Sequence, residues 1–133
     1  MKLQTHLIAT SLLFMGLYPH YRHMALLVFV GGFFIDMDHY FYYIMKTKDL
    51  NLKKAYHFCE NKTYSDVFCI FHHFEFIAIL FLIGFFSSYV MLVSIGASVH
   101  FAMDIIHIAV SRRISREISD MSWIARLVKK IKS

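Results

Sequence analysis

The stretch that decides the fold is Gly31-Gly-Phe-Phe-Ile-Asp-Met-Asp-His-Tyr-Phe-Tyr-Tyr43, an apolar and aromatic run that contains Asp36, Asp38 and His39. One Asp at the centre of a membrane helix costs roughly 2.5–3.5 kcal/mol. Two carboxylates and an imidazole so close together therefore require compensating partners, either a metal cation or a set of basic side chains. The remaining apolar runs must bring such partners to this stretch.

The composition places the chain among integral membrane proteins. Of its 133 residues, 58% are hydrophobic, and the mean hydropathy is +0.52. Soluble domains are only about 45–50% apolar. The net charge of +5 does not indicate nucleic-acid binding, because the basic residues are confined to a few segments. No nucleic-acid partner is expected.

Four apolar runs predict an all-α fold, an integral membrane bundle of four transmembrane helices. They cover approximately residues 3–18, 24–45, 66–91 and 92–110. A span needs about 20 apolar residues. In the polar segment between the second and third runs, Leu52, Ala55, Tyr56 and Cys59 recur at helical spacing, which predicts a short interfacial helix.

The C-terminal segment differs from the rest in being basic. Apolar residues recur there at roughly heptad spacing, for example Ile114, Ile118, Met121, Val128 and Ile131. This pattern predicts a basic amphipathic helix on an anionic membrane surface, with a short packing helix as the alternative. The predicted organisation is therefore a four-helix transmembrane domain at 1–111, which carries the metal-site candidates, and a basic amphipathic cytoplasmic tail at 112–133.

The distribution of Lys and Arg predicts the orientation. In the four-span arrangement every Lys and Arg except Arg22 falls on one side. Cytoplasmic loops of membrane proteins carry an excess of these residues. We therefore expect a multi-pass protein of the cell (inner) membrane with both termini in the cytoplasm.

Each of the four predicted helices carries ionisable side chains within its apolar run. Such residues are rare in membrane helices and are functional hypotheses by default. With alternating helix directions they fall in one layer, toward the cytoplasmic side. The predicted metal ligands are His6, Asp36, Asp38, His39, His72, His100 and Asp104.

Helical spacing supports most of this set, since residues three or four apart share a helix face. Asp36 lies three residues before His39, and His100 lies four before Asp104. Asp38 is two residues from Asp36 and should face away from it in a regular helix. Three roles are open to Asp38: binding a second metal, orienting a ligand His, or contacting another helix.

His and Asp side chains together are typical ligands of a divalent metal, with zinc expected first and manganese or iron as alternatives. A bound ion would offset the carboxylate charge and acidify a water molecule, which yields a hydroxide nucleophile. Glu75 is the predicted general base, with a spare Asp as the alternative. His107 is the predicted general acid, with His73 as the alternative.

These residues resemble the membrane-bound metal-dependent hydrolases of the YdjM-like family. The resemblance rests on Thr5-His6, Ile35-Asp36-Met37-Asp38-His39, a His-led motif in the third run, and His100 with Asp104. The chain departs from that family at Ile35, where a Pro is usual, and at Phe71-His72-His73-Phe74-Glu75-Phe76, where a His-Arg motif is common. The resemblance implies a metal-dependent hydrolase that acts on phospholipid-like esters.

The sequence therefore predicts a membrane-embedded hydrolase acting on phospholipids or lipid-linked phosphoesters through metal-activated water, with the lipid bilayer and a lipid-like substrate as partners. One alternative is a proton or metal-ion transporter, which would require an oligomer and polar groups across the whole membrane depth. The other is a non-catalytic membrane protein with a structural metal or polar network. The oligomeric state is left open.

Overall fold

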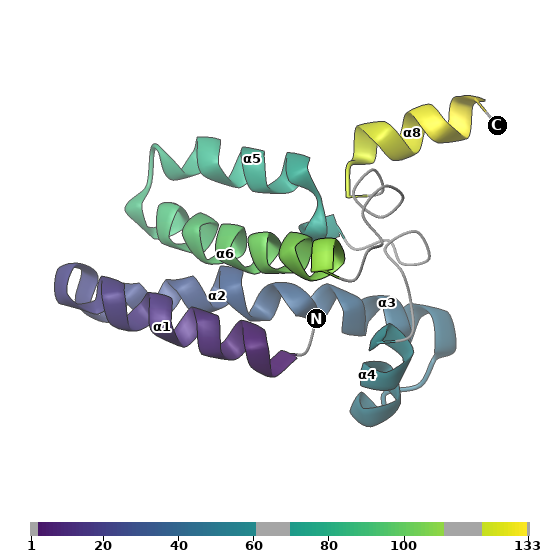
Figure 1. The fold of residues 1–133 in the computed structure, drawn as a ribbon, viewed down its shortest axis with the longest axis horizontal. Helices are drawn as coiled ribbons and strands as arrows, with labels where there is room; N and C mark the ends of the chain where they lie inside the picture. The colour runs from purple at the N-terminus through teal and green to yellow at the C-terminus, as the bar shows by residue number, and fades with distance from the viewer. Residues whose placement is uncertain (1–2, 61–69, 111–120, 133) are drawn as a thin grey trace.

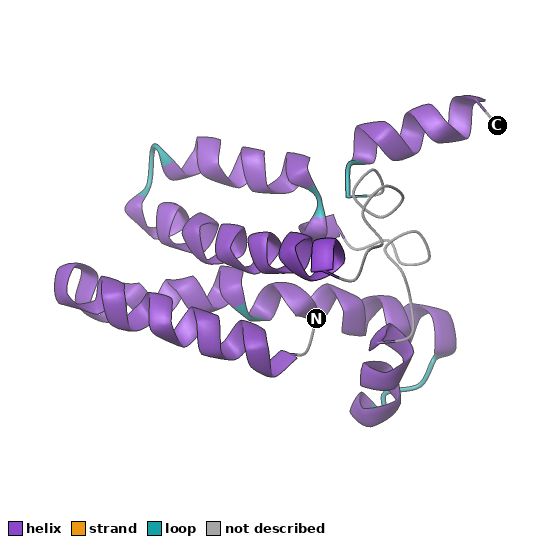
Figure 2. Cartoon of the chain, viewed as in Figure 1, coloured by secondary structure: helices purple, strands orange, loops and turns teal. Residues whose placement is uncertain are grey.

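The described part of the chain consists of helices and their connections. The computed structural model describes residues 3–60, 70–110 and 121–132, and no strand occurs among them. The elements are α1 (Leu3–Tyr21), η1 (Arg22–Leu27), α2 (Val28–Gly32), η2 (Phe34–Asp36), α3 (Met37–Thr47), α4 (Leu52–Glu60), η3 (Ile70–His72), α5 (Phe74–Gly84), α6 (Ser88–Val110) and α8 (Trp123–Lys132), where η denotes a 3₁₀ turn (Figures 1 and 2). The all-α prediction is confirmed.

The helices form two hairpins that reverse at the same end of the molecule. The first reverses where α1 ends, and Arg22 has a left-handed backbone with φ of 50°. Thr10 of α1 then lies beside Gly32, to whose carbonyl its Oγ1 donates a hydrogen bond of 3.0 Å. The second reverses between α5 and α6. Tyr21 and Phe85, one from each turn, line a common pocket, and Figure 1 shows both turns at one end.

The hairpins meet where α2 lies against α6, with their backbones in direct contact. A Cβ built on Gly31 would lie 2.0 Å from the carbonyl oxygen of Val93, and one on Gly96 would lie 2.2 Å from that of Val28. Only glycine fits at such separations. This contact fixes α6 against α2 one turn before His100.

Two helical runs are long and apolar enough to cross a membrane, Gln4–Thr47 and Ser88–Val110. The prediction of four such helices is wrong for the described residues. The third predicted span reduces to α5, whose 11 residues extend only about 16 Å, about half of a hydrocarbon core. The chain turns at 85–87, so that α6 begins at Ser88 and takes residues that the prediction gave to the third span.

Among the described residues, many large apolar side chains are exposed, and several polar ones are buried beside the apolar core. Large apolar side chains are exposed along α1, α5 and α6, among them Ile8, Leu12, Leu82 and Ile106. The buried polar side chains are His6, Thr10, Asp38, His72, His73, Ser94, His100 and Asp104. Soluble proteins seldom expose large apolar patches. Together with the two long apolar helical runs, the exposed apolar side chains point to membrane association.

Two smaller helices match the sequence analysis. The interfacial helix expected from Leu52 and Ala55 is α4, which packs on α3 through Phe58 and Tyr43, with ring centroids 5.4 Å apart. The basic C-terminal helix is present as α8, where the apolar Ile124, Leu127, Val128 and Ile131 are exposed. Residues 111–120 lie outside the described part, and with them Ile114, Ile118 and the predicted domain boundary.

Candidate metal centre

Five elements bring all seven predicted ligand residues into one cluster, which we call the His/Asp cluster. Its members are His6 (α1), Asp36 (η2), Asp38 and His39 (α3), His72 (η3), and His100 and Asp104 (α6). Most of their side chains are buried, although three of the seven are carboxylates. Carboxylates are buried only when paired or bound to a cation.

A break in the second arm of the first hairpin orients the two aspartates. After α2 the chain leaves the helical conformation at Phe33, with φ −134° and ψ −49°, and continues through η2 before α3 starts. Beyond the break, Asp36 Oδ1 lies 3.3 Å from His72 Nε2, and Asp38 Oδ2 lies 3.1 Å from His72 Nδ1, so the two carboxylates contact opposite nitrogens of one ring. Of the three roles left open for Asp38, contact with a ligand His is the one that these distances match. The same break lets the Gly32 carbonyl accept hydrogen bonds from Thr10 Oγ1 and His100 Nδ1.

The centre of the cluster is formed by two histidine nitrogens and two carboxylates. His72 Nε2 lies 3.1 Å from His100 Nε2, and Asp36 Oδ1 lies 3.3 Å from the first and 3.4 Å from the second. Asp104 Oδ2 lies 3.4 Å from His100 Nε2 and 3.9 Å from His72 Nε2. Ligands around one tetrahedral ion with bonds of 2.0–2.2 Å lie roughly 3.3–3.6 Å apart.

Hydrogen bonds on the far side of each ring determine which nitrogens face the centre with a lone pair. His100 Nδ1 lies 3.1 Å from the Gly32 carbonyl, and His72 Nδ1 lies 3.1 Å from Asp38 Oδ2. A carbonyl and a carboxylate only accept, so both Nδ1 atoms carry the proton. Both Nε2 atoms are then available as ligands, which is how metal-binding histidines are commonly held.

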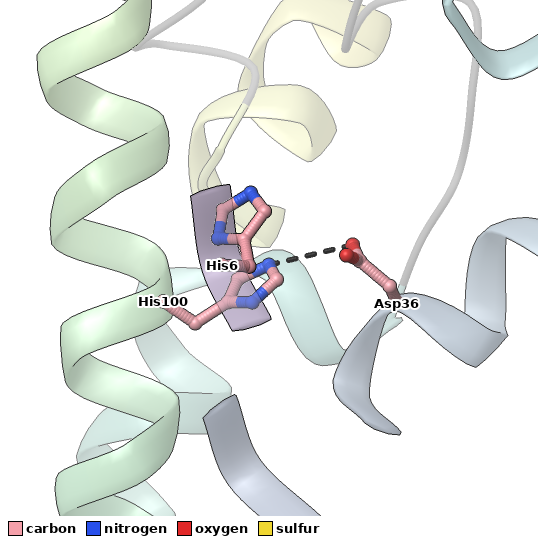
Figure 3. A group of neighbouring side chains, drawn as sticks. All are labelled: His6, Asp36 and His100. Carbon is pink, nitrogen blue, oxygen red and sulfur yellow. Dashed lines mark ion pairs between the residues drawn. The ribbon is translucent and has the colours of Figure 1, made fainter. Parts of the chain in front are cut away.

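The donor set fits a divalent cation. Two imidazole lone pairs and the Asp36 oxygen face one another within 3.4 Å, and only a cation or additional protons can satisfy them. Figure 3 shows Asp36 opposite His100, with the His6 ring beside His100. Three groups of ligand atoms each lie within 4.8 Å: His6, Asp36 and His100; Asp36, His39 and His72; and His72, His100 and Asp104. Such a set suits zinc, manganese and iron alike.

Within the described part of the chain, the members of the cluster differ in their exposure. The side chains of Asp36 and His39 are 24% and 25% exposed, whereas those of His72 and His100 are 1% and 0% exposed. His6 lies on the buried side of the cluster. Its Nε2 lies 3.3 Å from Asp104 Oδ1, and its ring stacks on that of His100. A ligand can therefore approach over the edge formed by η2 and the start of α3.

The structure does not bring the two predicted catalytic residues, Glu75 and His107, to the cluster. His107 is exposed on α6, almost one turn beyond Asp104, and belongs to none of the three ligand groups. Glu75 instead binds the start of α8, accepting hydrogen bonds from the Ser122 hydroxyl and from the backbone N–H groups of Trp123 and Ile124. The alternative acid His73 is buried on that same side, with its ring 5.4 Å from that of Trp123.

The charge on Glu75 suits this capping role. A carboxylate beside the first N–H groups of a helix interacts favourably with the helix dipole. Neither this contact nor the role of the Gly32 carbonyl was predicted from the sequence. The Gly31-Gly32 pair is the one local sequence feature that indicates a backbone carbonyl available to side-chain donors.

We expect Glu75→Ala to loosen α8 without changing metal content, because Glu75 caps α8 and does not contact the cluster. Loss of these hydrogen bonds should cost about 1–2 kcal/mol. Trp123 is the only tryptophan of the chain, so its fluorescence emission should shift to the red. Glu75→Gln, which keeps an acceptor, should shift it less. Loss of bound metal with unchanged Trp123 emission would instead show that Glu75 contributes to metal binding and does not cap α8.

Comparisons of the chain with models of protein families, with curated proteins and with solved structures gave no match. The fold and the His/Asp cluster are therefore described from this chain alone. Resemblance to the YdjM-like hydrolases remains a hypothesis that rests on the residues quoted above.

Proposed function

We propose that this chain is a membrane-embedded, metal-dependent hydrolase of the YdjM-like kind, acting on a phospholipid or a lipid-linked phosphoester. The observation that supports it is the convergence of His72 Nε2, His100 Nε2 and Asp36 Oδ1 within 3.4 Å of one another, inside a bundle with an apolar surface.

Asp36, His72, His100 and Asp104 are the residues that would hold the metal. When bound, a divalent ion supplies Lewis acidity and makes water a stronger nucleophile near neutral pH. Catalytic metal sites keep one position open, whereas structural sites are closed. The partial exposure of Asp36 and His39 supports an open site. The proton-transfer roles predicted for Glu75 and His107 receive no support from their positions.

The surroundings of the open edge favour a lipid substrate. Phe34 and Met37, which flank Asp36 in the chain, are exposed, and so is Phe71, whose backbone N–H binds Asp38. A substrate that reaches Asp36 over this edge meets apolar side chains. An acyl chain would bury that apolar surface, at about 25 cal/mol per Å², while the head group reaches the cluster.

We further propose that the basic end of the molecule faces the cytoplasm. Arg22 lies at the reversing end of the first hairpin, whereas the basic α8 lies near the end that carries the cluster (Figure 1). This separation matches the excess of Lys and Arg on the cytoplasmic side of membrane proteins. The zinc assignment and the inner-membrane location belong to the same proposal.

Purification in detergent without chelator, followed by metal analysis and a hydrolysis assay, tests the proposal. We expect stoichiometric divalent metal, and hydrolysis of phospholipids that a chelator abolishes. A soluble phosphoester without an acyl chain serves as the matched substrate and should be cleaved more slowly. Absence of metal from protein purified in metal-replete medium would refute the hydrolase. Metal without hydrolysis of any lipid would favour a structural metal site.

A further inference from the structure

We propose that Asp38 positions the metal ligand His72 and is not itself a ligand. This inference rests on the proposed metal centre and assigns a distinct role to one of its seven residues. The sequence leaves three roles open for Asp38. The contacts of its two carboxylate oxygens support this one.

Both oxygens of Asp38 are occupied by donors from the protein. Oδ2 accepts hydrogen bonds from the backbone N–H of Phe71, at 3.2 Å, and from His72 Nδ1, at 3.1 Å. Oδ1 lies 2.8 Å from His39 Nδ1. Asp38 also belongs to none of the three groups of ligand atoms that could hold an ion. Its hydrogen bonds therefore hold the rings and backbone around the centre.

His72 needs such a partner because its own backbone gives it little support. It ends η3, a turn of three residues, and His73 after it is extended, with φ −114° and ψ 145°. His100, by contrast, lies within the 23-residue helix α6. Asp38 fixes both the position of the short turn, through the N–H of Phe71, and the proton on His72 Nδ1.

His72 and His100 are therefore held by equivalent contacts from different sources. The Gly32 carbonyl fixes the tautomer of His100, and the Asp38 carboxylate fixes that of His72. In each case the opposite nitrogen, Nε2, faces Asp36. Loss of such a partner behind a ligand histidine typically weakens metal binding by about 10–100-fold without removing a ligand.

The test compares Asp38→Asn with the unmutated chain and with His72→Ala. Asn has the shape of Asp and retains one acceptor oxygen, so packing is kept, and a thermal melt verifies the fold. Zinc affinity is measured by competition with a chelator, and the absorption of the Co²⁺-substituted protein reports coordination number. Asp38→Asn should bind as many ions as the unmutated chain, with unchanged coordination and about 10–100-fold weaker affinity. His72→Ala should change the coordination.

Asp49→Asn is the matched control, since Asp49 lies in the loop before α4 and pairs with Lys54 at 2.9 Å. It should leave affinity unchanged. A changed coordination number or a lost ion in Asp38→Asn would make Asp38 a ligand. Unaltered affinity would show that Asp38 does not position His72. Either outcome leaves the proposed function intact, which fails only if the unmutated chain binds no metal or hydrolyses no lipid.

Discussion

Gly96→Ala should unfold the bundle at a markedly lower temperature and weaken metal binding, although Gly96 touches no ligand atom. The added Cβ would lie 2.2 Å from the Val28 carbonyl oxygen and 3.0 Å from the Gly32 backbone nitrogen. Backbone atoms cannot rotate away as a side chain can, so α2 and α6 must separate. Overpacking costs typically about 1–3 kcal/mol, and we expect at least the upper part of that range.

The effect on the metal centre follows from the position of the contact. His100 lies one turn after Gly96 on α6 and binds the Gly32 carbonyl, which is part of the same contact. Separation of the helices therefore moves His100 away from Asp36 and His72. Gly16→Ala is the control, because nothing lies within 4 Å of its Cβ. Removing a mid-helix glycine there should stabilise α1 by up to about 1 kcal/mol.

Thermal melts in detergent, followed by circular dichroism and paired with metal analysis, measure both effects. The expected order of melting temperature is Gly16→Ala at or above the unmutated chain and Gly96→Ala well below both. A Gly96→Ala variant that melts with the unmutated chain would show that α2 and α6 do not touch through their backbones.

Asp36→Ala should reduce metal affinity by more than about 100-fold, beyond what loss of an outer partner causes. Asp36 Oδ1 is the carboxylate oxygen that lies within 3.4 Å of both ligand nitrogens, His72 Nε2 and His100 Nε2. Without it, two lone pairs face each other at 3.1 Å with less negative charge to attract a cation. Lipid hydrolysis should fall at least in proportion to metal occupancy.

Asp36→Asn separates charge from shape, since it keeps the side-chain volume and removes the charge. It should also bind metal weakly, whereas Asp49→Ala on the exposed loop should bind normally. Chelator competition gives the affinities, and the hydrolysis assay at saturating metal gives the activity. Normal metal content in Asp36→Ala would place the ion elsewhere in the cluster, or show that protons alone hold the cluster together.

Much of the His/Asp cluster could be predicted from the sequence, because two independent patterns agree. Each apolar run carries its own ionisable residues, and the Lys and Arg distribution sets the direction of each run. His6, Asp36, His72 and Asp104 then fall at one level, and the structure brings them together. In a bundle of antiparallel helices, residues at the same level of neighbouring helices lie side by side, so these residues are expected to meet.

The errors arise where the chain is not regular helix. Glu75, the predicted general base, follows the extended backbone of His73, and its carboxylate binds the start of α8 and not the cluster. The turn at 85–87 also lies a few residues before the predicted boundary between the third and fourth apolar runs, at 91 and 92, and only Ser87, Ser88 and Tyr89 interrupt the apolar sequence there.

The exposed apolar side chains and the buried His/Asp cluster have a consequence for mutational tolerance. In a water-soluble protein the interior accepts only apolar residues of the right size, and the surface accepts almost any polar one. Here the exterior, with residues such as Leu12 and Leu82, should accept many apolar residues of different shape. The interior at Gly31, Gly96 and the His/Asp cluster should accept almost none. Substitutions should therefore be tolerated at most of the exposed apolar residues and rejected at these glycines and at the His/Asp cluster.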